Sequence, residues 1–305
     1  MPGVPGQRVY SDEMVLNHDS NDEFIINEMN QGTGGFATQP VSFGQIIQGP
    51  PPLLIQGLSV VRSGKTVLKE IDLVIEKGEF VGIVGPNGSG KSTLLLATLG
   101  VLKAQTGTVE IYGESPLSRR LYGKVGWVAQ AAANLPRHVR VTVRELVQLG
   151  TVNIGNMFSF MSDERRQRVK KAIEMVGLED VQDIDVGRLS GGQRQRAVIA
   201  RALASDADFI LLDEPLVGID RDARNSLLKL LDRLCHDEGK TIVMVSHDLA
   251  AMSQTAHRMI FLEETIRFDG DAKDFPDLNA LASLRGIEHV HGDGHAHHHC
   301  HKEEE

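Results

Sequence analysis

This chain of 305 residues has few cysteines, few aromatic residues and no long apolar run. Its two cysteines, Cys235 and Cys300, are too few for a disulfide framework, which excludes the small secreted proteins that depend on one. Because no stretch approaches the roughly 20 apolar residues of a membrane-spanning helix, the sequence predicts no transmembrane segment. The N-terminus also lacks the basic and apolar regions of a signal peptide. We therefore expect a soluble cytoplasmic protein.

The chain also lacks an excess of positive charge. It has 32 basic and 41 acidic residues, which gives a net charge of -9. Proteins that bind nucleic acid need a basic surface, so this balance argues against nucleic acid as the main partner. It does not exclude a local site for an anionic nucleotide. The apolar fraction of 41% is sufficient for a normal core in one large or two small domains.

Glycines gather in the segment Gly85–Thr93, which reads GPNGSGKST. An apolar run of strand type, Phe80–Val84, precedes this segment, and an apolar stretch of helical type, Leu94–Leu99, follows it. Strand, glycine-rich loop and helix together predict a phosphate-binding loop, because backbone N–H groups can turn inward around an anion at the helix N-terminus. The Lys91 ammonium can then reach the β- and γ-phosphates, and the Ser92 hydroxyl can ligate Mg²⁺.

The alternative interpretation of this segment is a glycine-rich turn beside an ordinary surface lysine. The flanking strand and helix favour the nucleotide site. The residues of the segment that we expect to contact the nucleotide are Gly85, Pro86, Asn87, Gly88, Ser89, Gly90, Lys91, Ser92 and Thr93.

The remaining chain divides into an N-terminal extension, one domain and a C-terminal tail. Residues 1–52 are rich in polar residues, Gly and Pro without strand or helix periodicity, which predicts a disordered extension. Residues 53–288 are the expected nucleotide-binding domain, and residues 289–305 are a His-rich tail. Strands are expected over 54–60, 65–68, 71–75, 80–84, 106–113, 125–129, 209–213, 241–245, 259–262 and 265–268.

Helical patterns replace strands between about residues 131 and 188. Thr142 and Glu145 have the spacing of a capping box, and Ser162 precedes a helix that stops at Gly177. Further helices are expected after Gln193, over 227–234 and, capped by Asp277, through Leu284. Because strands and helices alternate around this insert, we expect an α/β fold with a mostly parallel sheet and helices on both faces.

Polar residues follow four of the predicted strands. In an open parallel sheet, ligands bind beyond the carboxyl ends of the strands, so Gln130, Asp213, Glu214 and His247 are candidates to converge on the glycine-rich loop. Asp213 suits Mg²⁺ held through water, Glu214 could orient or deprotonate an attacking water, and His247 could contact the γ-phosphate. The alternative for the Asp-Glu pair is a strand-ending turn, and for His247 a polar helix cap.

The order of these motifs resembles the nucleotide-binding subunit of an ABC transporter, over about Leu54 to Leu284. The segment 85–93 matches the Walker A motif, and Gln130 falls at the Q-loop. The matching segments that follow are the signature motif at 189–193, Walker B at 209–213 with Glu214 at the catalytic glutamate, the D-loop at 217–220 and the switch histidine at His247. The resemblance implies a P-loop NTPase of ABC type, with an antiparallel β subdomain and a small helical subdomain.

The resemblance also implies how such a subunit works. ATP and Mg²⁺ would lie between Walker A of one subunit and the signature of a second, so a homodimer is expected. Glu214, His247 and Gln130 would be catalytic, and Ser92, Gln130 and Asp213 would hold Mg²⁺. The residues expected to reach the nucleotide from the signature and D-loop are Ser190, Gly191, Gly192, Gln193 and Asp220.

Two positions depart from the family pattern. Arg62 stands where relatives often have an aromatic residue that stacks on adenine, and a guanidinium can also stack on a ring. Gly218-Ile219 replaces the usual Ala-Leu of the D-loop, which should leave Asp220 in place. Gln130 would link the nucleotide to the helical subdomain, which docks on a membrane permease in relatives.

The C-terminal tail is rich in metal-binding side chains. Imidazole and thiolate groups suit zinc, whereas manganese favours carboxylates. The candidate tail ligands are His289, His291, His295, His297, His298, His299, Cys300 and His301. The alternatives are a cloning tag and a solvated tail whose metal affinity has no role. The cassette is also similar to ATP-binding subunits of bacterial zinc/manganese importers.

Tail and resemblance together predict ATP-driven import of a divalent metal, with zinc favoured. The expected partners are a separate membrane permease and an extracytoplasmic metal-binding protein, which would place this chain at the cytoplasmic face of the membrane. The alternatives are manganese, a non-metal cargo such as a lipid or lipoprotein for export, a soluble ABC ATPase acting on ribosomes or DNA, and a metal-binding regulator switched by nucleotide.

Overall fold

The computed structural model describes residues 23–24, 47–130, 132, 140–152 and 161–276. The predicted helix after Asp277 and the His-rich tail lie outside these residues. The expected extension over 1–52 lies mostly outside them too. In its described part, Glu23–Phe24 (β1) pairs antiparallel with Ile47–Gln48 (β2).

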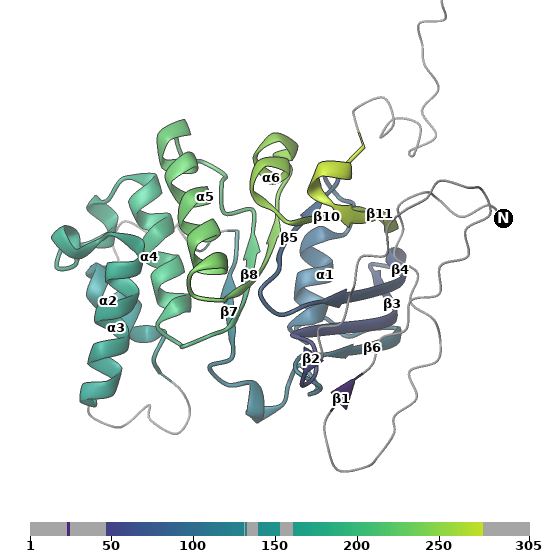
Figure 1. The fold of residues 1–305 in the computed structure, drawn as a ribbon, viewed down its shortest axis with the longest axis horizontal. Helices are drawn as coiled ribbons and strands as arrows, with labels where there is room; N and C mark the ends of the chain where they lie inside the picture. The colour runs from purple at the N-terminus through teal and green to yellow at the C-terminus, as the bar shows by residue number, and fades with distance from the viewer. Residues whose placement is uncertain (1–22, 25–46, 131, 133–139, 153–160, 277–305) are drawn as a thin grey trace, which may run out of the picture.

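A six-stranded, mostly parallel sheet runs through the centre of the fold (Figure 1). Its spatial order is β11 (Thr265–Asp271), β10 (Arg258–Glu263), β5 (Phe80–Val84), β9 (Thr241–Val245), β8 (Phe209–Asp213) and β7 (Val125–Val128). Only β11 is antiparallel to its neighbour, as the predicted final hairpin requires. Every residue of β5, β8 and β9 is buried, because continuous apolar strands need cover on both faces.

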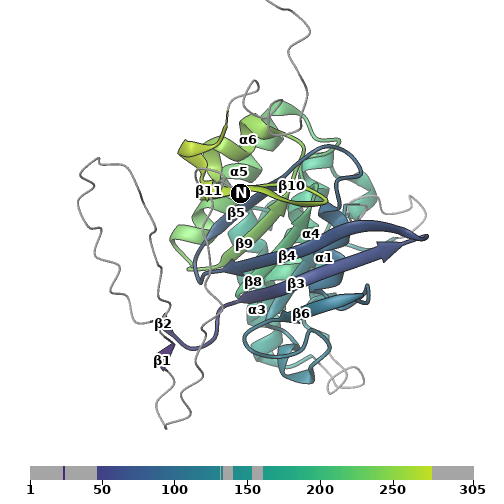
Figure 2. The same cartoon turned by 90° about the vertical axis from the view of Figure 1, so that its right-hand side faces the viewer.

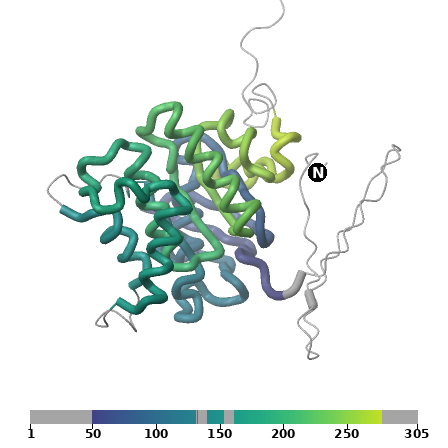
Figure 3. The backbone as a smooth tube through the Cα atoms, turned by 60° about the vertical axis from the view of Figure 1, so that its left-hand side comes forward, coloured from purple at the N-terminus to yellow at the C-terminus, as the bar shows by residue number. Residues whose placement is uncertain are grey.

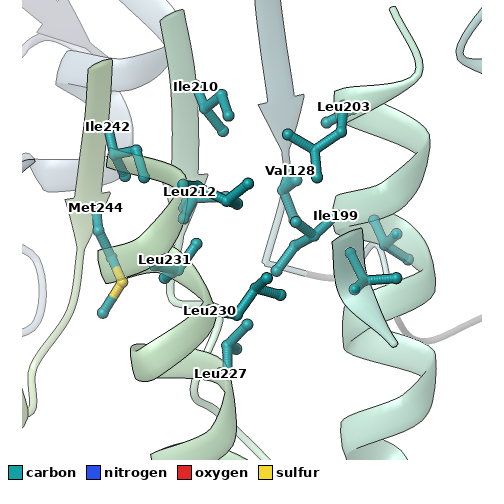
Figure 4. Close-up of a cluster of buried hydrophobic side chains, with 14 of the residues drawn as sticks. Val128, Ile199, Leu203, Ile210, Leu212, Leu227, Leu230, Leu231, Ile242 and Met244 are labelled. Atoms are coloured by element: carbon teal, nitrogen blue, oxygen red, sulfur yellow. The ribbon is translucent and has the colours of Figure 1, made fainter. Parts of the chain in front are cut away.

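Alternate side chains of the parallel strands enter two separate cores. Leu212 of β8 and Met244 of β9 point to the face covered by α4 and α5 (Figure 4). Their neighbours Leu211 and Val243 point to the other face, where they pack in a core shared with α1 and a second sheet. The period of two along a strand therefore divides the interior into two layers. The helices outside this sheet are α1 (Lys91–Thr98), α4 (Gly191–Leu203), α5 (Arg221–His236) and α6 (Leu249–Thr255).

The second sheet is antiparallel and lies over α1 (Figure 2). It has the order β4 (Lys65–Ile75), β3 (Leu53–Arg62), β6 (Thr106–Glu110). The expected strands 65–68 and 71–75 form one continuous strand, so the prediction of two strands was wrong. Glu70 takes a left-handed φ of 47° beside a register shift in the pairing with β3, so the strand continues through an irregularity instead of breaking.

The helical part packs at the far side of the parallel sheet from the antiparallel one (Figures 1 and 3). It contains α2 (Val143–Leu149) and α3 (Asp163–Val176), both against α4. The predicted capping box of Thr142 and Glu145 is confirmed, as are the Ser162 cap and the stop at Gly177. Single 3-10 turns cover Arg119–Leu121, Glu179–Val181, Val186–Arg188 and Ala272–Asp274. No helix in the described residues has the length and apolar character needed to cross a membrane.

Candidate nucleotide-binding site

The loop between β5 and α1 depends on its glycines. Gly85 has a φ of 155°, and a Cβ there would lie 2.2 Å from the Leu262 carbonyl oxygen. Gly90 caps α1 with a φ of 102°, and a Cβ there would lie 2.6 Å from the Leu68 side chain. A side chain at Gly85 would require the backbone to move, and one at Gly90 would have to adopt a left-handed φ and displace the Leu68 side chain. The loop is therefore held close to its neighbours, with its backbone free to face a ligand.

Lys91 opens α1 and folds back over the loop. Its Nζ donates to the carbonyl oxygens of Gly85 and Pro86, both at 2.9 Å. Burial lowers the pKa of Lys91, while the nearby Glu214 and Asp213 carboxylates act to raise it. Two of the three ammonium donors are used in this way. The cation is positioned at the loop, where a phosphate can replace the carbonyl oxygens as acceptor.

Ser92 and Asp213 bring two oxygen ligands together. The Ser92 hydroxyl donates to Asp213 Oδ1 at 3.0 Å, and Asp213 ends the buried strand β8. Burial raises the pKa of Asp213, the Ser92 hydrogen bond lowers it, and the Glu214 charge raises it. A hydroxyl, a carboxylate and the amide of Gln130, which lines the same cleft as Ser92, are the hard oxygen donors that Mg²⁺ prefers. The donor set therefore fits Mg²⁺.

Glu214 and His247 form a second pair beside the first. His247 Nδ1 lies 2.8 Å from Glu214 Oε2, and because an ionised carboxylate only accepts, the histidine donates from Nδ1. Glu214 is 8% exposed and has a left-handed φ of 50°, held by a backbone hydrogen bond to Val245. His247 is more exposed. The predicted convergence of the strand ends is therefore seen for Lys91, Ser92, Asp213, Glu214 and His247.

These elements surround an open cleft of about 490 Å³. The residues that line it are Arg62, Ser63, Val67, Asn87, Gly88, Gly90, Lys91, Ser92, Thr93, Gln130 and Glu214. Arg62, Ser63 and Val67 belong to the hairpin that β3 and β4 form, so the antiparallel sheet supplies one wall of the cleft. Sequence reasoning missed Ser63 and Val67; their place next to Arg62 in the predicted hairpin was the available signal.

Other predicted residues do not line this cleft. Pro86 and Gly85 hold Lys91 through their carbonyls, and Ser89 is buried in the loop. His247 contacts Glu214 and is not part of the cleft wall. The contact of His247 with a γ-phosphate stays a prediction.

The signature and D-loop residues meet each other at a separate place. A Cβ on Gly191 would lie 3.3 Å from the Gly218 carbonyl oxygen, and one on Gly192 would lie 2.5 Å from the Ala223 Cβ. Ser190 and Gln193 form a capping box at the start of α4, and the Asp220 carboxylate caps α5 through the Ala223 N–H. Gly192 therefore has a packing role, because α4 and α5 approach closely there. None of the residues that were predicted to reach the nucleotide from the signature and D-loop lines the cleft. They are Ser190, Gly191, Gly192, Gln193 and Asp220.

Comparison with known proteins agrees with this geometry. The sequence profile described as ABC transporter matches residues 68–217. The zinc uptake system ATP-binding protein ZurA of Listeria innocua is 36% identical over 72% of this chain and 87% of its own length. The high-affinity zinc uptake system ATP-binding protein ZnuC of Bacillus subtilis is 40% identical, over 65% of this chain and 84% of its own length. The manganese transport system ATP-binding protein MntA of Synechocystis is 36% identical, over 76% of this chain and 90% of its own length.

Solved structures share the fold. The ATP-binding cassette MJ0796, in a dimeric post-hydrolysis state bound to ADP and Pi, has a TM-score of 0.62 and 32% identity over 73% of this chain and all of its own. The cbiO1 protein of Clostridium perfringens is part of the ABC transporter complex cbiONQ. It has a TM-score of 0.66 and 30% identity, over 73% of this chain and 90% of its own. With the glycine-rich loop, the cleft and these relatives in agreement, the chain belongs to the ABC transporter family as an ATP-binding subunit, an ATPase.

Proposed function

We propose that this chain hydrolyses ATP to drive zinc uptake through a separate membrane permease. The observation that carries the proposal is the similarity to ZurA and ZnuC, which are named for zinc uptake and are matched over 87% and 84% of their lengths. Manganese is the second candidate, because MntA is 36% identical over a similar share of the chain. The tail composition favours zinc, since imidazole and thiolate suit it better than manganese.

In the proposed reaction, the loop and Lys91 hold the triphosphate. Ser92, Asp213 and Gln130 hold Mg²⁺, which supplies charge neutralisation on the phosphates when bound. This assignment of Mg²⁺ ligands is supported by the Ser92–Asp213 hydrogen bond and by the position of Gln130 on the cleft wall. Four further residues of the loop, Asn87, Gly88, Gly90 and Thr93, line the same cleft.

Glu214 is the proposed base that accepts a proton from the attacking water. It lines the cleft, and its carboxylate is buried. His247 holds it in place through the Nδ1 hydrogen bond at 2.8 Å, which leaves one carboxylate oxygen, Oε1, for the water. Arg62 is proposed to stack on the base of the nucleotide, because it is exposed at the cleft wall and a guanidinium is planar.

Two such chains are proposed to act together as a homodimer. Ser190, Gly191 and Gly192 lie away from this chain's own cleft, which supports a role toward the nucleotide of a second copy. The helical part around α2 and α3 is the proposed docking surface for the permease, with Gln130 as its link to the nucleotide. This assembly would sit at the cytoplasmic face of the membrane, with an extracytoplasmic metal-binding protein in the same system.

The tail from His289 to His301 is proposed to bind zinc loosely and to buffer or sense it. Seven histidines and one cysteine lie within thirteen residues, and they define no single tetrahedral site. This proposal is separate from transport itself, because the tail lies outside the family match over residues 68–217.

The test of transport is the metal content of cells that lack this protein. Complementation with the native chain restores cellular zinc, and complementation with Glu214→Gln does not, because that variant keeps the cleft but loses the base. Manganese is measured in the same samples. If manganese falls instead of zinc, the cargo proposal is wrong while the ATPase remains. If neither metal changes, both metal proposals are wrong.

A further inference from the structure

An ion pair joins the first turn of α5 to the start of α6. Arg224 Nη1 on α5 donates to Asp248 Oδ2, the residue that caps α6. The two helices lie side by side (Figure 1). The Arg224 and Asp248 side chains are 39% and 21% exposed, so water screens the pair only in part. No step of the proposed reaction uses this pair.

Asp248 is tied to the proposed catalytic pair by the chain itself. Its Oδ1 accepts the Ala251 N–H at 3.0 Å, which caps α6, while Oδ2 is used by Arg224. His247, which donates to Glu214, is the residue directly before it. A shift of Asp248 therefore also shifts the His247 ring relative to the Glu214 carboxylate.

Arg224 is tied to the signature side of the molecule. Its backbone N–H donates to the Asp220 carbonyl oxygen at 2.9 Å, in the helix turn that the Asp220 carboxylate caps. The preceding Gly218 lies against Gly191. The contacts thus run from Gly191 through the Asp220 turn to Arg224, then to Asp248 and His247.

The arginine is a poor choice if stability alone were at stake. Its Nε is buried and has no hydrogen-bond partner among the residues that the structure describes. In the structure Arg224 donates to Asp248 through Nη1 alone, to Oδ2, so the pair does not form the two parallel hydrogen bonds that make arginine–carboxylate pairs strong. A buried unpaired N–H is unfavourable. Stability therefore does not explain why an arginine stands at position 224, whereas a role in positioning Asp248 does.

We propose that Arg224 is a positioning residue for ATP hydrolysis: through Asp248 it fixes His247 against Glu214 and links that pair to the loop that contains Asp220. The inference rests on the roles proposed for Glu214 and His247. Loss of Arg224 should slow the chemical step, because the His247–Glu214 pair is then less well positioned. Nucleotide binding should stay intact, because Arg224 does not line the cleft.

The test compares steady-state kcat and KM for MgATP in single and double variants. Arg224→Gln removes the cation, and Asp248→Asn removes the charge but keeps an oxygen to cap α6. We expect each to lower kcat by about tenfold, since small misplacements of catalytic groups are costly, with KM changed by less than about twofold. The double variant should be no slower than either single one, because both break the same link. Arg224→Lys should restore most of kcat.

The matched control is Arg221→Gln, an exposed arginine in the same turn of α5. The inference is overturned if Arg224→Gln and Arg221→Gln have the same kcat, if the two single effects add, or if the activity loss follows a loss of melting temperature. His247→Ala separates the two levels of the argument. If His247→Ala retains full kcat, the proposed role of His247 fails and this inference with it; if only His247→Ala is slow, the coupling alone is wrong.

Discussion

Asp213 is held in surroundings that oppose its charge. Burial raises the pKa of its carboxyl first, and the Glu214 charge raises it further, against the Ser92 hydrogen bond. Only the ionised form is a good Mg²⁺ ligand. A carboxyl with a raised pKa takes up its proton at a higher pH than an ordinary aspartate does, so acid competes with Mg²⁺ earlier at this site.

We predict that the Mg²⁺ concentration needed for half-maximal MgATP binding rises as the pH falls, and that this rise begins at a higher pH than an aspartate with an ordinary pKa would give. In Glu214→Gln the rise should begin at lower pH, because removing that charge lowers the pKa of Asp213. Binding of a fluorescent ATP analogue at a series of Mg²⁺ concentrations measures both curves. Asp213→Asn reports the part of the pH dependence that belongs to the nucleotide. Coincident curves for the native chain and Glu214→Gln would contradict the argument.

At this scale the sequence predicted most of the residues but not their pairing. Asp213 and Glu214 were visible because they end a continuous apolar run, and Lys91 and Ser92 because they end a glycine-rich loop. That Ser92 pairs with Asp213, and His247 with Glu214, depends on strands β5, β8 and β9 being neighbours. Contacts over 121 and 33 positions cannot be read from local pattern.

Helices α2 and α4 each begin with a capping box. Thr142 and Glu145 cap α2, and Ser190 and Gln193 cap α4. The first box was predicted from its spacing. The box of Ser190 and Gln193 was not predicted, because these residues were assigned only to the signature motif. Ser190 therefore has two candidate tasks, to begin a helix and to contact a nucleotide on a second chain.

The two tasks can be separated by comparing Ser190→Ala with Thr142→Ala. Each variant loses one capping hydrogen bond to the helix backbone, so we predict that each lowers the free energy of unfolding by about 1 kcal/mol. Thr142→Ala also loses the exposed hydrogen bond from its hydroxyl to Glu145, so its loss should be at least as large as that of Ser190→Ala. Only Ser190→Ala should also lower ATPase activity. Urea unfolding and an ATPase assay on the same preparations measure the two effects. Full activity in Ser190→Ala would restrict that residue to helix capping and remove support for the dimeric site.

The whole chain joins an ATPase to a tail of different chemistry. The ATPase is built on two cores, one on each face of the parallel sheet, and its cleft forms where the strands of that sheet meet the hairpin of the antiparallel sheet. The tail follows this unit in sequence and lies outside the described residues. Because the described residues of both cores and of the cleft come before the tail, we expect that the tail can be removed by truncation without loss of the ATPase.

We predict that a chain ending at residue 288 hydrolyses ATP at the native rate but binds less zinc than the full chain. Equilibrium dialysis against Zn²⁺ alone measures the difference. Zinc bound by the full chain should decrease below about pH 6.5, because only neutral imidazole is a ligand. A full-length variant with His297, His298 and His299 changed to Asn controls for length. Equal zinc binding by the full and shortened chains would show that the tail is not the site.

The sequence alone determined the order of elements, the phosphate-binding loop and the acids that end β8, because these follow from local periodicity and from the rarity of the glycine pattern. It also indicated the family, since the motifs stand in a fixed order. The tertiary structure decided what no local pattern encodes: that β4 is continuous, that Ser63 and Val67 join the cleft, and that Arg224 reaches Asp248. These features depend on which strands and helices become neighbours, and that choice is made by packing of the two cores rather than by any short stretch of chain.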